Sequence, residues 1–208
     1  MQYIKNIDST STELRRRMSA EELPHGYCIS ADFQTAGHGQ ATNHWGSEDG
    51  KNLLFSLLLR PSVIPASEQF VITEIVTLAI INALQDYIRQ RIIIKWPNDI
   101  YVGDKKLCGI LIENALCGPT IDTCIVGIGI NINQELFTSN APNPISLKQL
   151  NGRDNDREEI FEEIYQNILR YYDYLADNWQ NNDIKQSLYY EYMNNLYRLL
   201  KEYYISGN

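Results

Sequence analysis

The side chains best suited to chemistry lie near the middle of the chain, in Lys95-Trp96-Pro97-Asn98-Asp99 and at Lys106. Pro97 lacks a backbone N–H and restrains Trp96 to extended geometry, so this segment is expected where a strand ends and the chain turns. Such a turn fixes the directions of Asn98 and Asp99. An amide and a carboxylate held beside Lys106 can together bind a nucleotide, its metal and an anionic substrate.

A second candidate feature is the run Gly127-Ile128-Gly129-Ile130-Asn131-Ile132-Asn133. By the alternation of strands, its glycines and asparagines share one face and its isoleucines the other. Glycine weakens a strand unless something must approach the backbone closely, so the glycine face is a candidate ligand platform. A hairpin centred near Gly118 would place Gly109 opposite Gly127, and two facing glycines would leave a slot.

Hydrophobic periodicity predicts the elements that position these residues. Helices are expected over 13–22, from Pro65 through Tyr87, over 157–179 and over 184–200, with one or two helical turns at 146–150. Strands are expected over 27–33, 52–59, 92–94, 100–102, 106–115 and 121–133, and Gly103-Asp104 fits a two-residue hairpin turn. The segment from Gln34 to Gly50 is predicted to be a long loop, of the kind that forms lids or binding segments.

Composition narrows the class of protein. The chain has 208 residues and a net charge of −8, which argues against a broad surface for DNA or RNA. The length favours one domain over 1–208, with a helical part from about 146 to 202. The four cysteines are interpreted as reduced core thiols, and the absence of a signal region or a long apolar stretch predicts a cytoplasmic protein without membrane contact.

The order of three motifs resembles that of the biotin-protein ligases. These motifs are Lys-Trp-Pro-Asn-Asp at 95–99, Lys-Leu-x-Gly-Ile-Leu beginning eleven residues later at Lys106, and Gly-x-Gly-x-Asn-x-Asn at 127–133. Upstream, Asp8-Ser9-Thr10-Ser11 resembles the family's Asp-Ser-Thr-Asn biotin contact. Gln34-Thr35-Ala36-Gly37 resembles the entry to its adenylate loop. The resemblance extends from Asp8 to about Arg198.

This resemblance implies an α+β fold with a mixed, largely antiparallel central sheet flanked by helices, related to class II aminoacyl-tRNA synthetases. It implies an enzyme that uses ATP and Mg²⁺ to convert biotin into biotinyl-5′-AMP. The biotin then passes to a lysine of a biotin carboxyl carrier domain. Neither the N-terminal DNA-binding domain nor the C-terminal SH3-like domain of some relatives is expected, and a homodimer is possible.

The resemblance also implies roles for individual residues. Lys106 would lie at the biotin carboxylate and α-phosphate, and Asp99 would support the metal or orient its neighbours, so these two are the expected catalytic residues. The ureido ring of biotin would contact Ser9, Thr10 and Gln34, and the nucleotide would lie near Asn98 and Asn131. The remaining binding residues would be Ser11, Gly37, His38, Gly39, Gln40, Trp45, Lys95, Trp96, Gly109, Ile110, Gly127 and Gly129.

The loop at 37–45 departs from the family pattern. The family has Gly-Arg-Gly-Arg-x-Gly-Arg-x-Trp, whereas this chain has Gly-His-Gly-Gln-Ala-Thr-Asn-His-Trp. Arginine offers a permanent charge and a forked set of donors that these side chains do not replace. A second hypothesis is therefore an impaired or non-catalytic paralogue that binds biotin or a carrier. A third is a lipoate or octanoyl transferase of the related fold.

Three features also have a purely structural interpretation. Ser9 and Thr10, followed by Glu13, match a helix-capping box, and this is compatible with ligand contact. The dense tyrosines of the last two helices are interpreted as amphipathic core positions rather than a stacking surface for a nucleobase. His38 and His44 are interpreted as polar loop residues, and no metal ligand is assigned.

Overall fold

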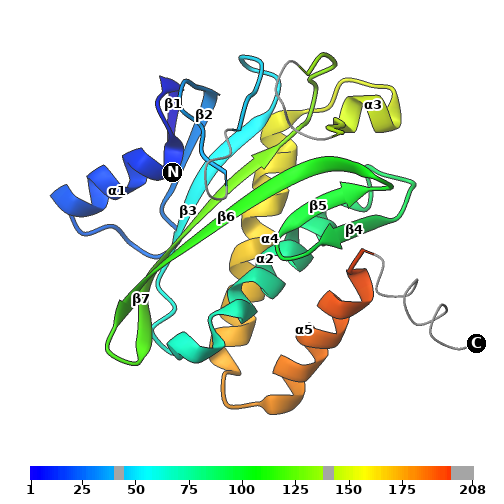
Figure 1. Ribbon diagram of the computed structural model, residues 1–208. Helices are drawn as coiled ribbons and strands as arrows, with labels where there is room; N and C mark the ends of the chain where they lie inside the picture. The colour runs from blue at the N-terminus through cyan, green and yellow to red at the C-terminus, as the bar shows by residue number, and fades with distance from the viewer. Residues whose placement is uncertain (40–44, 138–142, 198–208) are drawn as a thin grey trace, which may run out of the picture.

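The computed structural model describes residues 1–39, 45–137 and 143–197. Its centre is a seven-stranded sheet with the order β1-β2-β3-β7-β6-β5-β4 (Figure 1). β1 and β2 pair in parallel, and the other neighbouring pairs are antiparallel, which confirms the expected mixed, largely antiparallel sheet. The strands are β1 (Gln2–Ile7), β2 (Cys28–Gln34), β3 (Leu53–Leu59), β4 (Ile92–Lys95), β5 (Asp99–Val102), β6 (Lys105–Cys117) and β7 (Thr120–Ile130).

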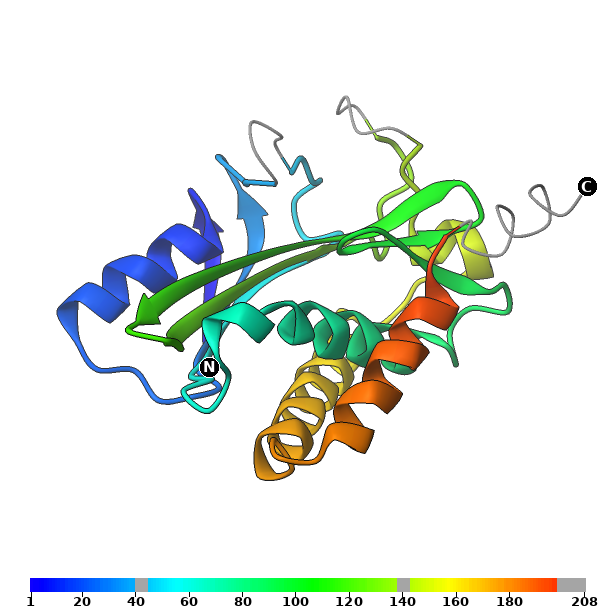
Figure 2. The same cartoon turned by 60° about the horizontal axis from the view of Figure 1, so that its bottom comes forward.

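Helices lie on both faces of this sheet, but they cover them unequally (Figure 2). Three helices, α2, α4 and α5, cover one face, which we call the helix face; the opposite face carries α1 and is called the open face. The helices are α1 (Thr10–Ala20), α2 (Phe70–Leu84), α3 (Leu147–Asn151), α4 (Arg157–Asp177) and α5 (Asn182–Asn195), with a short 3-10 helix at Ala66–Glu68.

The main core lies between the sheet and the helix face. Alternating strand residues point into it, so Ile128 is 4% exposed and Ile130 is fully buried. α2 is apolar on nearly all sides because it is packed between the sheet and two other helices. β3 is buried along its whole length, since the helices cover one side of it and α1 covers much of the other.

A smaller core lies under α1 on the open face. It consists of Leu14, Leu23, Ile29, Leu58 and Ile125. Because α1 is short, this packing covers only the part of the sheet near one end of β2, β3 and β7. The rest of the open face is left to polar residues, glycines and loops.

The structure corrects the predicted register of the β6–β7 hairpin. Gly109 lies opposite Gly129, and Gly127 lies opposite Leu111. The turn consists of two residues, Gly118 and Pro119, and a bulge near Ala115 and Leu116 shifts the pairing by one more residue. The total shift of two residues changes the partner of Gly109 but leaves every side chain on its predicted face.

The remaining elements agree with the sequence pattern except in a few places. β1 was not predicted; it is an edge strand whose partner β2 is distant in sequence. The turn at Gly103-Asp104 joins β5 to β6 as expected. α5 ends at Asn195, and the residues from 198 onward that were expected to be helical lie outside the described part of the chain.

Burial also bears on the cysteines and tyrosines. Cys117 is exposed, which contradicts its interpretation as a core thiol, whereas Cys28, Cys108 and Cys124 are buried. The core interpretation of the tyrosines holds for Tyr172 and Tyr192 and is wrong for the exposed Tyr174, Tyr189 and Tyr190.

Among the described helices, none is both long and apolar enough to cross a bilayer.

Candidate active site

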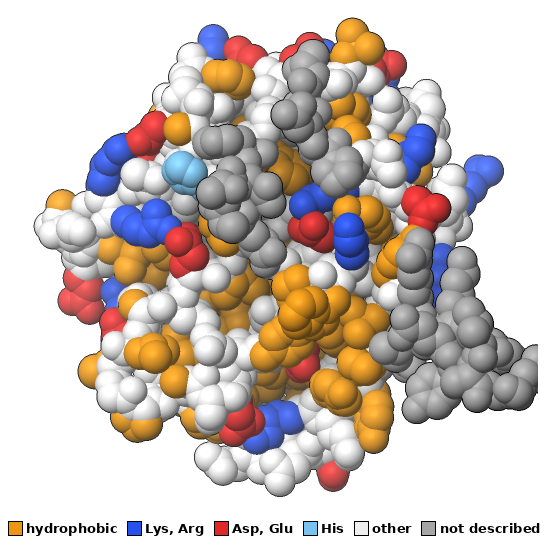
Figure 3. Space-filling view, viewed as in Figure 1, with side chains coloured by type: hydrophobic (Ala, Val, Ile, Leu, Met, Phe, Trp, Pro, Cys, Tyr) orange, Lys and Arg blue, Asp and Glu red, His pale blue; other side chains and the backbone are white. Residues whose placement is uncertain are grey.

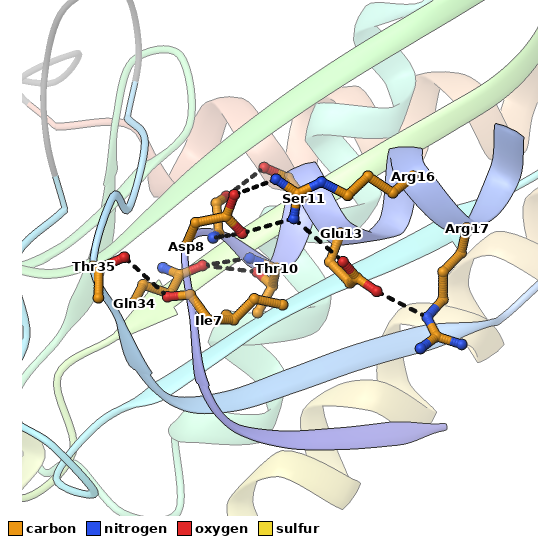
Figure 4. A network of polar contacts seen from close by, with 10 residues as sticks. Ile7, Asp8, Thr10, Ser11, Glu13, Arg16, Arg17, Gln34 and Thr35 are labelled. Carbon is orange, nitrogen blue, oxygen red and sulfur yellow. Dashed lines mark hydrogen bonds and ion pairs between the residues drawn. The ribbon is translucent and has the colours of Figure 1, made fainter.

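A buried polar cluster lies on the open face where β1 leads into α1 (Figure 4). The backbone N–H and the hydroxyl of Thr10 both donate to Oε1 of Gln34, at 2.7 and 3.0 Å. The hydroxyls of Ser9 and Ser11 lie 3.0 Å apart. Ser9, Thr10 and Ser11 are each no more than 5% exposed. The structure therefore brings the three hydroxyls and Gln34 together, as the sequence predicts.

Ser56 extends this cluster and was missed by the sequence analysis. Its hydroxyl, in the middle of β3, is fully buried and lies 2.8 Å from the hydroxyl of Thr10. Ser56 is opposite Gly127, where an added Cβ would lie 3.7 Å from the Ser56 oxygen. The single polar residue within the apolar run Leu53–Leu59 was a signal that could have identified it.

The two facing glycines, Gly109 and Gly129, form a floor for the indole of Trp45. A Cβ at Gly109 would lie 2.7 Å from Trp45 Cζ3, and one at Gly129 would lie 2.4 Å from Trp45 Cε2. Both positions therefore require glycine in this conformation. The predicted slot exists, but its floor pairs Gly109 with Gly129 and it holds the Trp45 side chain, so a ligand entering it must move the indole.

Trp45 is held at its backbone by the start of the same loop. Its N–H donates to the carbonyl of Gly37 at 3.0 Å. A Cβ on Gly37 would lie 2.5 Å from the Trp45 carbonyl oxygen, so this buried position also requires glycine. The indole Nε1 is buried without a hydrogen-bond partner among the described residues.

Lys106 and Asp99 form an ion pair beside this glycine floor. Lys106 Nζ lies 2.6 Å from Asp99 Oδ2 and 5.8 Å from the centre of the Trp45 ring. The two side chains are 20% and 27% exposed, so solvent and ligands can reach them. Asp99 is opposite Gly109 across β5 and β6, which places the pair at the edge of the glycine floor, as the sequence predicts.

Asn98 and Asn131 have backbone partners. The amide of Asn98 donates to the carbonyl of Ile110 at 2.7 Å. The amide of Asn131 donates to the carbonyls of Ile145 at 3.1 Å and Lys106 at 3.4 Å. Both asparagines are at most 5% exposed. In this conformation they join neighbouring segments, and their predicted contact with a nucleotide stays a prediction.

Several predicted residues are not brought into the cluster. The side chain of Ile110 belongs to the main core and only its carbonyl faces Asn98, so its predicted ligand contact stays a prediction that can involve its backbone alone. Trp96 is 70% exposed, and Lys95 is exposed with its ammonium 5.1 Å from the centre of the Tyr101 ring. His38 is exposed and Gly39 is partly exposed, whereas Gln40 lies outside the described residues, as do Asn43 and His44.

The expected capping box at the start of α1 does not form. Ser9 is the N-cap residue, but its side chain makes no capping hydrogen bond and instead contacts Ser11. Glu13 pairs with Arg16 and Arg17 (Figure 4). Arg16 also binds both oxygens of Asp8, which lowers the pKa of that carboxyl.

A second anchor, also missed from sequence, holds the chain that follows Trp45. Arg157 at the start of α4 donates to Asp32 Oδ1 at 3.0 Å and to the carbonyl of Asn52 at 3.1 Å. Gln134 Oε1 accepts from the side chain of Asn52 at 2.5 Å and from the backbone of Glu48 at 3.1 Å. These contacts join β2, the end of the loop, the segment after β7 and α4, and they position the loop that carries Trp45.

Charge at this site is local. In Figure 3 a small group of basic and acidic side chains lies on the open face among uncharged surroundings. Among residues 1–39, 45–137 and 143–197, no group of three or more His, Cys, Asp or Glu side chains could hold a metal ion. The described residues therefore supply no metal cage, and the cation that they place at the glycine floor is Lys106.

Comparison with known proteins identifies relatives of this arrangement. The model of the "Biotin/lipoate A/B protein ligase family" matches residues 3–131. "Bifunctional ligase/repressor BirA" of Bacillus subtilis is 32% identical over 177 residues, which is 82% of this chain and 54% of that protein. The "Biotin--[acetyl-CoA-carboxylase] ligase" of Paracoccus denitrificans is 30% identical over 167 residues, which is 76% of this chain and 67% of that protein. The chain thus spans about half the length of the Bacillus BirA proteins it matches.

Solved structures agree with these matches. The "Biotin protein ligase from Aquifex aeolicus in complex with biotin and ATP" superposes with a TM-score of 0.78 at 27% identity, covering 95% of this chain and 78% of that one. The Leishmania major biotin protein ligase in complex with biotinyl-5-AMP has a TM-score of 0.75 at 20% identity. The match covers 95% of this chain and 81% of that one. At that identity the likeness shows the fold alone.

Proposed function

Because this chain belongs to the biotin/lipoate A/B protein ligase family, we propose that it activates biotin as biotinyl-5′-AMP and transfers it to a lysine of a biotin carboxyl carrier domain. The observation that carries the proposal is the Lys106–Asp99 pair at the edge of the Gly109–Gly129 floor. A buried row of hydroxyls from Ser9, Thr10 and Ser56 leads away from that floor. Together they offer a cation for carboxylate and phosphate, a flat surface for an aliphatic chain and hydrogen-bonding groups for a polar ring.

In the first step an oxygen of the biotin carboxylate attacks the α-phosphorus of ATP. The new O–P bond forms as the bond to the β-phosphate oxygen breaks, and pyrophosphate leaves with the electron pair. Two anions must approach each other, and the ammonium of Lys106 offsets their repulsion. The carboxylate is already ionised at neutral pH, so this step needs positioning rather than a general base.

In the second step the uncharged amine of an acceptor lysine attacks the acyl carbon of biotinyl-5′-AMP. The C–N bond forms, the C–O bond to phosphate breaks, and AMP leaves with the electron pair while the proton of the amine passes to solvent. Lys106 stabilises the negative charge that develops on the departing phosphate. Asp99 acts as a positioning residue, because its carboxylate holds the lysine ammonium at the edge of the glycine floor.

Biotin-dependent exchange of labelled pyrophosphate into ATP tests the first step. We expect the wild-type chain to catalyse this exchange and Lys106→Met to reduce it by about 100-fold or more, as for other electrostatic groups at a developing charge. Lys185→Met is the matched control, because Lys185 also forms an ion pair and its side chain is 22% exposed, but it lies on α5. Equal losses in both variants would contradict the role of Lys106.

A second candidate function is binding without turnover, and the sequence of the loop favours it. The segment Gly37-His38-Gly39 has no arginine, and neither has the rest of the loop up to Trp45. If the wild-type chain binds biotin but catalyses no exchange, this candidate replaces the first. The triple variant His38→Arg, Gln40→Arg, Asn43→Arg then separates a decayed loop, which would gain activity, from a loop that was never catalytic.

Whether the protein binds biotin or lipoate also needs a direct test, because the family is named for ligases of both acids. We expect biotin to bind more tightly than lipoate, since a ureido ring can use the hydroxyls of Ser9, Thr10 and Ser56 and a dithiolane ring cannot. Calorimetric titration with each acid measures the difference. Tighter binding of lipoate would move the proposal to a lipoate or octanoyl transferase.

A further inference from the structure

An apolar surface adjoins the proposed active site. Figure 3 shows hydrophobic side chains gathered below the small charged group, over the region where the β4–β5 turn, α2 and α5 meet at the edge of the sheet. Each of these elements carries an exposed aromatic residue next to Tyr192 or Pro97 in the chain or in space: Trp96 is exposed by 70%, Tyr189 by 45% and Phe70 by 38%. We call Phe70, Trp96 and Tyr189 the aromatic rim. Single exposed apolar residues are ordinary, but three from separate elements need a reason.

One buried side chain, Tyr192, joins α2 to the β4–β5 turn beneath the aromatic rim. The ring of Phe70 packs edge-on against Tyr192, with the centroids 5.5 Å apart. The Tyr192 hydroxyl donates to the carbonyl of Pro97 at 2.7 Å, and its residue is only 1% exposed. Tyr189 precedes Tyr192 by one helical turn and so shares its side of α5. Tyr192 therefore fixes Phe70 and the turn that carries Trp96 relative to α5.

The aromatic rim is close to the reacting groups. Trp96 follows Lys95, whose cross-strand partner is Asp99, and Asp99 binds Lys106 at 2.6 Å. Three residues of extended chain span at most about 10 Å, so Trp96 and Asp99 cannot be farther apart than that. A protein that covers Trp96 can reach the Lys106–Asp99 pair with one long side chain.

We propose that the aromatic rim is the docking surface for the folded carrier domain that presents the acceptor lysine. The proposal rests on the proposed function, because that lysine must reach an acyl carbon beside Lys106 and its domain must then cover the adjacent surface. Trp and Tyr are the residue types that most often supply the binding energy of interfaces. Lys95 is exposed next to Trp96 and adds a positive charge at this end of the surface.

The double variant Phe70→Ser, Tyr189→Ser tests this proposal, because neither residue belongs to the proposed active site. Three rates are compared: biotin-dependent pyrophosphate exchange, transfer of biotin to hydroxylamine, and transfer to the purified carrier domain. We expect kcat/KM for the carrier domain to fall at least 10-fold, mainly through KM, while exchange and transfer to hydroxylamine stay within twofold. Unchanged exchange also shows that the variant is folded. Tyr174→Ser, which removes a 55% exposed tyrosine from α4, is the matched control.

Trp96→Ala provides an independent measurement, expressed as the ratio of carrier transfer to exchange, which we expect to fall at least 10-fold. Normal labelling of the carrier by the double variant, or an equal loss with hydroxylamine, overturns the docking proposal while the proposed function stands. A wild-type chain without exchange refutes the proposed function and the docking proposal with it. Sedimentation that shows a wild-type dimer and a monomeric double variant would assign the aromatic rim to a second copy of this chain instead.

Discussion

The two faces of the central sheet carry opposite kinds of side chain on the same strands. On β7, Ile128 and Ile130 point to the helix face and are at most 4% exposed, whereas Gly127 and Gly129 point to the open face. On β6, Ile110 joins the main core, while its neighbour Gly109 lies beneath Trp45. Adjacent residues of one strand therefore face the main core on one side and the proposed ligand site on the other.

This difference shows how stability and function are divided. On the helix face, many aliphatic side chains pack against α2, α4 and α5, and each contributes through burial. On the open face, glycines remove packing volume and buried hydroxyls contact each other instead of apolar neighbours. Changes on the helix face should thus lower stability, and changes on the open face should mainly alter ligand binding.

The largest effect is expected for Ile130→Ala on the helix face. Removing a fully buried isoleucine side chain should lower the free energy of unfolding by about 2–5 kcal/mol, because a cavity remains. Urea unfolding followed by circular dichroism measures this as a lower midpoint with an unchanged slope. A loss below about 1 kcal/mol would show that the helix layer repacks freely, and the contrast between the faces would disappear.

The helix layer also contains an ionisable group, and Glu74 of α2 should make stability depend on pH. Glu74 is 6% exposed, and burial raises the pKa of its carboxyl from 4.5 to about 7. The folded state therefore keeps a proton that the unfolded state loses between these values, so stability falls as pH rises from 4.5 to 7. Glu74→Gln should be more stable than wild type by about 3 kcal/mol at pH 8.

This advantage of Glu74→Gln should vanish at pH 4, where the Glu74 carboxyl is largely protonated in the folded state. Thermal unfolding of wild type and variant at the two pH values gives the comparison. A stability difference that is the same at both pH values would mean that Glu74 does not titrate as its burial requires.

On the open face, Gly129→Ala should affect binding more than stability. Its Cβ would lie 2.4 Å from the Trp45 indole, so the ring must shift, and the added methyl would itself occupy the floor on which the aliphatic chain of biotin is proposed to lie. We expect biotin affinity to fall about 10-fold, or about 1.4 kcal/mol, with unfolding changed by less than about 1 kcal/mol. Calorimetry measures the affinity, and indole fluorescence in a Trp96→Phe, Trp179→Phe background reports the shift.

Gly127→Ala is the control for that indole shift. A Cβ at Gly127 would make only ordinary contacts, at 3.6 to 3.8 Å, with Leu111 and Ser56. The fluorescence of Trp45 should therefore stay as in wild type. If Gly127→Ala changes it as much as Gly129→Ala does, the indole does not rest on Gly129.

The smallest effect is expected for Ser56→Ala. The variant removes the hydroxyl that contacts Thr10 and should lower stability by about 1 kcal/mol. If Ser56 acts with Thr10 in holding the ligand, biotin affinity should fall as well, by several fold. Ser30→Ala on the neighbouring strand β2 is a control for the loss of a hydroxyl alone. Equal biotin affinity in the wild type, Ser56→Ala and Ser30→Ala would mean that Ser56 has only a structural role.

Much of the arrangement was determined by the sequence because it depends on local rules. Alternation along 127–130 assigned isoleucines to one face and glycines to the other, and that assignment survives a register shift of two residues, although β7 ends at Ile130 and not at 133 as predicted. Pro97 and the two-residue turn at Gly103-Asp104 placed Asp99 and Lys106 on adjacent strands. The family resemblance, confirmed by the match over residues 3–131, supplied the overall sheet.

Only the tertiary structure decided which distant residues meet. The bulge in β6–β7 set Gly109 opposite Gly129, and the folding of the loop placed Trp45 over both. Ser56 joins Thr10 because β3 happens to lie beside the start of α1, 46 residues away in sequence. Such contacts depend on strand order and on the packing of whole elements, and no local pattern of side chains encodes them.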